Sequence, residues 1–172
     1  MELNTLKTTP QWFAVYTRSK TEKKVKERLS LAGFESFLPL QTVIKQWSDR
    51  KKKVEEPLIK SYVFVNTTED KFTFLLNIPG VINILKYLGR PAVVRDVEIE
   101  NLRIVVNNSN QVKTVAPFDL SEGEDVEVVK GPFKGLFATY IQHSGKHKVI
   151  VKVEVLNTFV EVTIGVNSIY KV

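Results

Sequence analysis

The chain has 172 residues, of which 43% are hydrophobic and 26% charged, a composition typical of a soluble globular protein with one large or two small domains. No apolar run approaches the ~18 residues that a membrane span needs, and the N-terminus has no apolar signal segment. The chain has no cysteine, which excludes disulfides, thiol chemistry and cysteine-built zinc sites. We therefore expect a cytoplasmic protein that has no membrane partner.

The positive charge is unevenly distributed along the chain. The net charge is +6; residues 1–110 hold 18 basic and 12 acidic side chains, whereas residues 111–172 hold seven of each. A basic part joined to a neutral one is typical of a protein whose first part binds nucleic acid and whose second part binds protein. The alternative is a positive surface that serves solubility alone.

The first predicted elements are a strand and a helix. Residues 11–17 are rich in aromatic and β-branched side chains, which predicts a strand. Ser19, followed by Glu22 three residues later, has the spacing of a capping box and predicts the start of a helix. Gly33 fits the position just after the end of that helix, where a left-handed backbone is common.

The following segments alternate between extended and helical patterns. Residues 34–46 are extended but contain Pro39, which argues for an edge strand or a bend. The charged residues 47–56 are predicted to form the tip of a hairpin. The remaining elements of this part are a strand at 57–67, a short helix at 67–80, a strand at 81–88 and a helix at 95–108.

The order of these elements predicts an α+β protein with two domains. Residues 1–108 run β-α-β-β-α-β-α, which matches a ferredoxin-like split βαβ domain with an antiparallel sheet and helices on one face. Residues 109–119 are polar and aperiodic and are predicted to be a linker. Residues 120–172 contain only short strands separated by turn residues, which predicts a small all-β barrel.

The sequence holds no arrangement of residues that indicates catalysis. His143 and His147 have a spacing that suits a metal on a helix, but the Ser144-Gly145 pair between them predicts a hairpin turn, and no carboxylate is nearby. The sequence has neither a glycine-rich phosphate loop nor a nucleophile with a neighbouring base. We expect a binding protein that is not an enzyme and that holds no cofactor or metal.

The first predicted helix carries many cations outside its apolar face. Only two acidic residues interrupt them, and clustered mobile cations are what contact with phosphates requires. The alternative is an ordinary solvated helix surface. The basic run at residues 49–53 is a weaker indication, because hairpin tips are often charged for solubility alone. The predicted DNA-binding residues are Arg18, Lys20, Lys23, Lys24 and Arg28.

Two predicted strands, 11–17 and 57–67, are apolar on both faces. Helices can cover one face of such a sheet, and the other face would be left open. Tyr16, Tyr62 and Phe64 would lie on this open face, and an exposed apolar patch of this kind usually marks a partner site. The alternative is that the second domain covers these residues.

Residues 130–137, KGPFKGLF, predict a tight turn between two strands. Gly131 and Gly135 permit unusual dihedral angles, and Pro132 stiffens the turn. We expect Phe133 to point outward, where a preorganised aromatic ring is a good anchor for a partner. The alternative is that Phe133 folds back over the open end of the barrel.

Several stretches of the sequence resemble a known family. The segments WFAVYTRSKTEKKVKERL, GFESFLPL, KSYVFV and PGVINIL resemble the N-terminal (NGN) domain of the NusG family of transcription elongation factors. The segment GEDVEVVKGPFKGLFATY resembles the KOW motif, which implies that the barrel is a KOW (SH3-like) domain. The two matches cover nearly the whole chain in the order that the family shows.

The resemblance implies contacts with RNA polymerase, DNA and a further protein. The apolar face of the first domain would bind the clamp helices of the largest polymerase subunit, and Lys71-Phe72-Thr73-Phe74 would approach the β subunit. The basic residues named above would contact the non-template DNA strand. Phe133 and Lys134 would bind a small-subunit ribosomal protein or Rho. The residues that match the clamp-helix site are Ala14, Tyr16, Ile59, Tyr62 and Phe64.

The sequence departs from the general factor of the family at two places. Lys60-Ser61 stands where general members have Pro-Gly, and the stretch VLNTFVEVTIGV differs from the usual ending of the KOW domain. These departures make the chain similar to operon-specific antitermination factors of the RfaH or UpxY kind, which act within long operons. The alternatives are a general NusG-type elongation and termination factor, or a ribosome-associated KOW protein that binds RNA, which should have a basic second part. We expect a monomer.

Overall fold

The computed structural model describes residues 9–108, 112–115, 123–143, 146–153, 156–164 and 168–172. The chain divides into two compact units, which are described separately. Unit 1 consists of Met1–Leu38 and Ile59–Arg95, and unit 2 consists of Pro39–Leu58 and Asp96–Val172. The predicted boundary at residue 108 differs from this division, because the helix that begins at Asp96 groups with the C-terminal strands.

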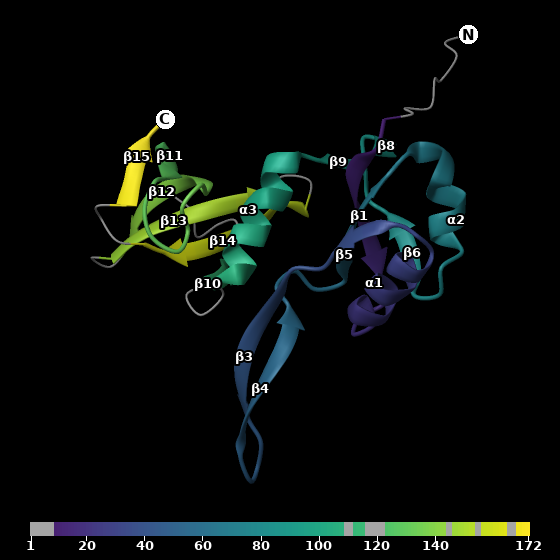
Figure 1. The fold of residues 1–172 in the computed structure, drawn as a ribbon, viewed down its shortest axis with the longest axis horizontal. Coiled ribbons are helices and arrows are strands. Elements are labelled where there is room, and N and C mark those ends of the chain that lie inside the picture. Colours follow the sequence, from purple (N-terminus) through teal and green to yellow (C-terminus); the bar gives the residue numbers. More distant parts are fainter. Residues whose placement is uncertain (1–8, 109–111, 116–122, 144–145, 154–155, 165–167) are drawn as a thin grey trace. The chain divides into compact units, whose positions relative to one another are not determined.

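Unit 1 is built on an antiparallel sheet whose strand order is β2-β5-β1-β6, with β9 also paired to β1 (Figure 1). This is the strand order of a ferredoxin-like split βαβ fold, so the predicted architecture is confirmed. The strands are β1 (Gln11–Thr17), β2 (Glu35–Phe37), β5 (Tyr62–Thr67), β6 (Val81–Ile84) and β9 (Val93–Val94), with a small hairpin of β7 (Lys86–Tyr87) and β8 (Arg90–Pro91). The helical elements are α1 (Glu22–Leu31), the 3-10 turn η1 (Glu69–Lys71) and α2 (Phe72–Leu76).

Both faces of the β1–β5 pair are apolar, as the sequence pattern predicted. On one face, Phe13 is buried and its ring meets Phe72 edge-on, with centroids 4.9 Å apart. On the other face, Ala14 and Phe64 lie directly opposite each other and are also buried. Burial of apolar side chains on two faces supplies the main stabilisation of unit 1, at about 1.5–3 kcal/mol for each large side chain.

The ends of α1 are set by one distant contact and one local motif. The predicted capping box at Ser19 is wrong, because the helix begins at Glu22, and the buried Glu22 carboxylate instead accepts a hydrogen bond from the Ser61 backbone N–H (2.8 Å). The predicted C-terminal glycine is confirmed. Gly33 has φ +82°, and the N–H groups of Gly33 and Phe34 donate to carbonyls of the last helical turn, which is a Schellman motif.

Ser61 has φ +64°, a left-handed conformation that a residue with a Cβ adopts at a cost of about 1–2 kcal/mol. We predict that Ser61→Gly stabilises unit 1 by about 1 kcal/mol, because glycine has no such penalty and keeps the N–H that Glu22 accepts. Thermal unfolding checks this, with an expected rise in Tm of roughly 4–8 °C. Ser61→Ala is the matched control, since it keeps the Cβ and should leave Tm unchanged or lower. A Tm for Ser61→Gly at or below that of Ser61→Ala would contradict the assignment of strain.

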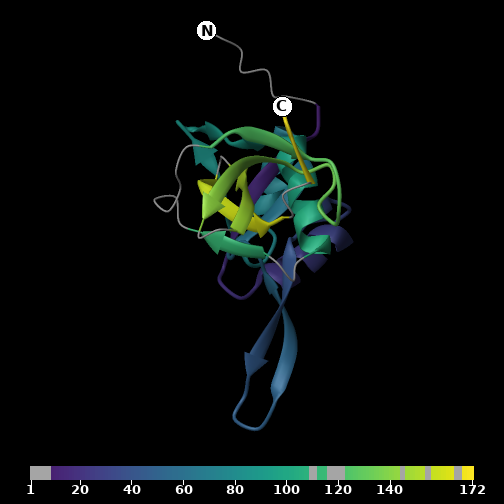
Figure 2. The ribbon, with the colours of Figure 1, turned by 90° about the vertical axis from the view of Figure 1, so that its left-hand side faces the viewer.

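Unit 2 contains the predicted barrel, whose strands follow the order β10-β14-β13-β12-β11-β15 and curve around a common core (Figure 2). The core is a layer of β-branched side chains that includes Val126, Val149, Val151, Val160 and Val162. The strands are β10 (Val112–Val115), β11 (Asp125–Val128), β12 (Phe137–His143), β13 (Lys146–Val153), β14 (Thr158–Thr163) and β15 (Ile169–Lys171), and the helix of this unit is α3 (Asp96–Asn107).

The predicted linker at residues 109–119 is wrong over part of its length. Val112–Val115 form β10, which pairs with Phe159–Val162 at the edge of the barrel sheet. The four-residue strand VKTV is too short to show periodicity, and its pairing partner is more than 40 residues away, so no local signal identifies it. The other residues of the predicted linker, 109–111 and 116–119, lie outside the described part of the chain.

The predicted charged hairpin is also present in unit 2. It consists of β3 (Leu40–Gln46) and β4 (Lys51–Pro57), which pair along their whole length. The four residues 47–50 close the turn, and the Trp47 N–H donates to the Arg50 carbonyl (2.8 Å). In the part of the chain that the structure describes, no third strand joins this pair, so it forms a two-stranded ribbon (Figure 1).

Candidate functional site

The candidate partner surface of unit 1 centres on two tyrosines at the end of the β1–β5 pair. Tyr16 and Tyr62 lie directly opposite each other, and their rings are 5.3 Å apart and inclined at 51°. Tyr16 is 39% exposed and Tyr62 is half-buried. Partial burial, with a smaller contribution from Tyr16, raises the pKa of Tyr62, so its phenol remains a hydrogen-bond donor at neutral pH. The two rings offer apolar area and polar tips together.

The other residues predicted for this face are not exposed, which corrects the expectation of a broad open surface. Ala14 and Phe64 are fully buried, and Ile59 is nearly so. Phe64 stacks on Phe37 with centroids 6.3 Å apart, and its strand is flanked by neighbours on both sides, so its ring belongs to the core. The exposed part of the face is therefore reduced to the tyrosine pair.

The segment Lys71-Phe72-Thr73-Phe74 divides into inward and outward side chains. Phe72 packs on the buried Phe13, whereas Lys71 and Thr73 are exposed. Phe74 is exposed, and its ring lies 5.7 Å from that of Phe34. The helical geometry of α2 thus leaves Phe74 exposed and turns the partly buried Phe72 toward Phe13.

The predicted DNA-binding cations are all exposed on or beside α1. Arg18 and Lys20 precede the helix, and Lys20 has φ +65° in the turn that leads into it. Arg28 is partly committed to structure, because its guanidinium donates to the Pro79 carbonyl. Gly80 lies close against α1, and a Cβ at this position would be only 2.7 Å from the Val25 side chain. The residues that the structure presents here are Arg18, Lys20, Lys23, Lys24 and Arg28.

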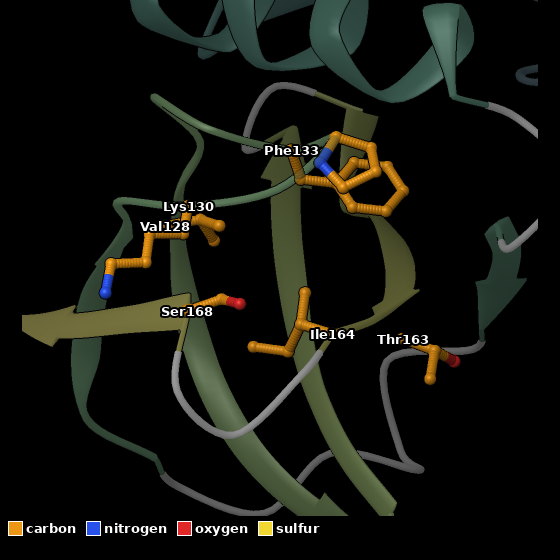
Figure 3. A pocket seen from close by; sticks show the side chains of 7 residues that line it. Val128, Lys130, Phe133, Thr163, Ile164 and Ser168 are labelled. Atoms are coloured by element: carbon orange, nitrogen blue, oxygen red, sulfur yellow. The ribbon is translucent and has the colours of Figure 1, made fainter.

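The turn at residues 130–137 does not present Phe133 outward, and this prediction is wrong. Phe133 is only 3% exposed and lines a pocket with Val128, Ile164 and Ser168 (Figure 3). The turn folds the ring back because Gly131 and Gly135 both have positive φ, and the Gly135 N–H donates to the Val128 carbonyl (2.7 Å). Lys134 remains exposed at the tip.

The pocket beside Phe133 is small. Its volume of about 120 Å³ is well below the roughly 300 Å³ at which cofactor and drug-sized ligand sites begin. Lys130, Thr163 and Ser168 supply its polar side chains. The pocket can hold one side chain or a few waters, and it has no arrangement of groups for catalysis.

Sequence reasoning missed Asn101, which holds α3 against the turn within unit 2. The buried Asn101 amide donates to the Phe137 carbonyl (2.8 Å) and accepts from the Phe137 N–H (3.1 Å), as a neighbouring strand would. Asn108 donates to the Pro132 carbonyl (2.7 Å). An asparagine inside a helix is normally read as a surface residue, so the sequence contains no signal for this contact.

The described residues contain no group of three or more side chains of the kinds that hold metals. His143 and His147 belong to β12 and β13 and flank a hairpin, as predicted, while the turn itself lies outside the described residues. Within the described part of the chain, no helix has both the length and the apolar character needed to cross a bilayer.

Comparison with known proteins identifies the family. The model of the family described as transcription termination factor nusG matches residues 10–103, more than half of the chain. The transcription termination/antitermination protein NusG of Lactococcus lactis subsp. lactis is 30% identical over 161 residues, covering 84% of this chain and 85% of that protein. The protein of the same name from Rickettsia bellii is 28% identical over 163 residues, covering 88% of this chain and 84% of that protein.

The fold agrees with a solved structure of the same family. The structure described as "Domain interaction in Thermotoga maritima NusG" covers 95% of this chain and 98% of its own, with a TM-score of 0.56 and 21% identity. The α+β sheet of unit 1 and the barrel strands of unit 2 therefore occur together in a known NusG fold. The chain belongs to the NusG family, a family of non-enzymatic transcription termination and antitermination factors.

Proposed function

We propose that this protein binds elongating RNA polymerase in the cytoplasm and suppresses termination within specific long operons. The observation that carries the proposal is the Tyr16–Tyr62 pair, two mutually inclined and partly exposed aromatic rings on a sheet face where Ala14 and Phe64 are buried. Tyrosine is enriched at protein interfaces because its ring supplies contact area and its hydroxyl tolerates water. The clamp helices of the largest polymerase subunit are the partner that the family resemblance implies for this face.

A second polymerase contact is proposed at α2. Lys71, Thr73 and Phe74 are exposed on one short helical segment, and we assign them to the β subunit. A protein that held both sides of the polymerase cleft would favour the closed, elongating state. Its effect on termination would then be a shift of a conformational equilibrium, with no covalent step.

The cations of α1 are proposed to contact the non-template DNA strand. Five exposed basic residues on or beside one helix provide mobile positive charges for phosphates. The Arg28 guanidinium already donates a hydrogen bond to the Pro79 carbonyl, so Lys20 and Lys24 are the better candidates for direct contact with DNA.

The KOW barrel is proposed to recruit a further protein, either a small-subunit ribosomal protein or Rho. Phe133 is buried, whereas Pro132 and Lys134 are exposed on the turn, and we assign the contact to them. A general elongation and termination role is the second candidate for the whole protein. The names of the relatives favour it, because each is called a termination/antitermination protein without reference to an operon.

The function is tested by measuring readthrough of a terminator by reconstituted elongation complexes. We expect readthrough to rise on templates from the target operon and to remain unchanged on unrelated templates. Equal readthrough on all templates would assign the general role, and no effect on any template would contradict the proposal.

The same complexes test the α1 surface. We predict that Lys24→Ala makes the dependence of log affinity for the complex on log salt less steep by about 0.7, the value for one phosphate contact on a single strand. Lys86→Ala removes one exposed lysine from the β7–β8 hairpin and is the matched control. If the slope of log affinity against log salt is the same for Lys24→Ala and for the control, the cations of α1 form an ordinary solvated helix surface and Lys24 does not contact DNA.

A further inference from the structure

Two aromatic side chains and one acid form a row on the outer surface of the barrel in unit 2. The register places Glu127 of β11 directly opposite Phe137 of β12 on one side and Tyr170 of β15 on the other. Val126 and Leu136, their neighbours along β11 and β12, are buried, so strand alternation turns the row outward. We call Tyr170, Glu127 and Phe137 the aromatic–acid row; it crosses three adjacent strands (Figure 1).

Both rings of the aromatic–acid row are exposed. Phe137 is 46% exposed and Tyr170 is 67% exposed, whereas Glu127 between them is half-buried. None of the ion pairs among the described residues involves Glu127. A single aromatic ring on a surface needs no explanation. Two rings on either side of one carboxylate are a specific combination, because the ring faces and the carboxylate all attract positive charge.

The backbone hydrogen bonds set the spacing of the row. The Phe137 N–H and C=O both bond to the Asn101 amide, so they face away from β11 and the backbone of Phe137 is held in place. Glu127 and Phe137 are therefore a non-hydrogen-bonded pair, with Cα atoms about 4.5 Å apart. The backbone of Glu127 faces β15 instead, so its pair with Tyr170 is the hydrogen-bonded kind, about 5.5 Å apart. The two aromatic residues thus stand roughly 10 Å apart, with the carboxylate between them.

A gap of this width suits one planar cation. A guanidinium group is planar, stacks on aromatic faces and can form two parallel hydrogen bonds with a carboxylate. A ring attracts a cation within about 6 Å of its centroid, so a guanidinium placed over Glu127 is within reach of both rings. An ammonium group has no flat face for stacking and fits less well.

The charges around the row favour a basic protein segment over nucleic acid. Asp125 is exposed on the same face as Glu127, and its carboxylate accepts a hydrogen bond from the Thr139 hydroxyl (3.2 Å). Lys152 is exposed on β13, two strands from Glu127, so the centre of the row is acidic. Exposed rings can also stack on bases, but surfaces that bind single strands place cations beside the rings for the phosphates. Acids in that position repel a phosphate backbone.

We propose that the aromatic–acid row binds an arginine side chain of a partner protein, with the guanidinium between the rings of Phe137 and Tyr170 and over the Glu127 carboxylate. This site lies on β11, β12 and β15, whereas the contact proposed above for the barrel lies on the turn at Pro132 and Lys134. The inference rests on the proposed recruitment of a further protein by the barrel. It adds a second contact and names the chemistry of the partner, a segment with an exposed arginine.

NMR titration of the full-length protein provides a direct readout, because it measures weak, millimolar affinities residue by residue. The probe is a capped six-residue peptide of glycine and serine with one central arginine. We expect it to shift the amide signals of β11, β12 and β15 in a saturable way. The same peptide with citrulline in place of arginine is the matched control, since citrulline has nearly the shape of arginine without its charge, and it should produce no such shifts. A lysine peptide should bind more weakly than the arginine peptide.

The variants test each member of the row. Glu127→Gln, Phe137→Leu and Tyr170→Leu should each weaken binding of the arginine peptide about 2- to 5-fold, and the triple variant roughly tenfold or more. The matched controls are Glu27→Gln and Tyr87→Leu, which remove one exposed acid and one exposed ring from unit 1 and should leave the affinity unchanged. Glu127→Gln replaces only a surface charge, so its result does not depend on how well the ring variants fold.

Equal binding of the arginine and citrulline peptides would overturn the proposal, as would a Glu127→Gln affinity equal to that of Glu27→Gln. A single-stranded oligonucleotide that shifts the same signals and competes with the peptide would also overturn it, because the rings would then stack on bases. Readthrough and polymerase affinity do not enter this titration. Failure here therefore leaves the proposed polymerase contact intact, and failure of the readthrough test leaves the arginine site to be judged by the titration alone.

Discussion

Replacing Phe133 with alanine is expected to destabilise the barrel of unit 2 by about 3–5 kcal/mol, the usual range for removing a buried phenylalanine. The ring is almost fully buried and lines the same small pocket as Val128 and Ile164, so its loss enlarges a space that the tight turn at Gly131 and Gly135 cannot easily close. A small domain has a total stability of only about 5–15 kcal/mol. We therefore expect the barrel of the Phe133→Ala protein to unfold well below the wild-type temperature.

Urea and thermal unfolding of the full-length protein, followed by circular dichroism, measure this effect. Lys134→Ala is the matched control, because it changes the next residue of the same turn, which is exposed, and should shift stability by no more than about 0.5 kcal/mol. Phe133→Leu should fall between the two. If the Phe133→Ala protein unfolds at the wild-type midpoint, the ring does not belong to the core. The first interpretation, in which Phe133 points outward and anchors a partner, would then be favoured.

The turn shows where sequence reasoning reaches its limit. Its residue types predict a tight turn correctly, since Gly131 and Gly135 do adopt positive φ. They do not determine the direction of the Phe133 side chain, which lines one pocket with Val128 and with Ile164, a residue 31 positions further along the chain. A turn signal is local, whereas burial is a property of the assembled barrel.

The ends of α1 give the same contrast within one element. Gly33 could be predicted because the Schellman motif involves only the last turn of the helix and the residues after it. The role of Glu22 could not, because its partner is the backbone of Ser61, 39 residues further along the chain. Its spacing from Ser19 fits a capping box equally well, and only the fold distinguishes the two roles.

The sequence pattern predicted which residues share the candidate polymerase face, but not how much of that face is exposed. Strand alternation placed Tyr16, Tyr62 and Phe64 on one face, and the register confirms this. The pattern cannot show which of these residues lie at the centre of the sheet. Phe64 is covered there, whereas the tyrosines lie at the end of the strand pair and remain accessible.

Tyr16→Ala combined with Tyr62→Ala is expected to weaken binding of the protein to RNA polymerase about 30-fold or more, equivalent to roughly 2 kcal/mol. The two rings pack against each other, so either single variant also removes support from the ring that remains. We therefore expect each single variant to lose a large share of the effect, and the two losses not to add. Tyr62→Phe should bind more strongly than Tyr62→Ala, since it keeps the ring and removes only the hydroxyl.

The measurement is the equilibrium affinity of each variant for core polymerase, with the unfolding midpoint determined in parallel. Tyr87→Ala is the matched control, because Tyr87 is an exposed tyrosine on the β7–β8 hairpin, which is not part of the β1–β5 pair. Phe64→Ala is unsuitable, since loss of a core ring would weaken binding through unfolding. The double variant should bind polymerase more weakly, but the salt dependence of its binding should not change, because the substitutions remove no basic or acidic side chain. A folded double variant that binds polymerase as tightly as the Tyr87→Ala control would exclude this pair as the polymerase contact.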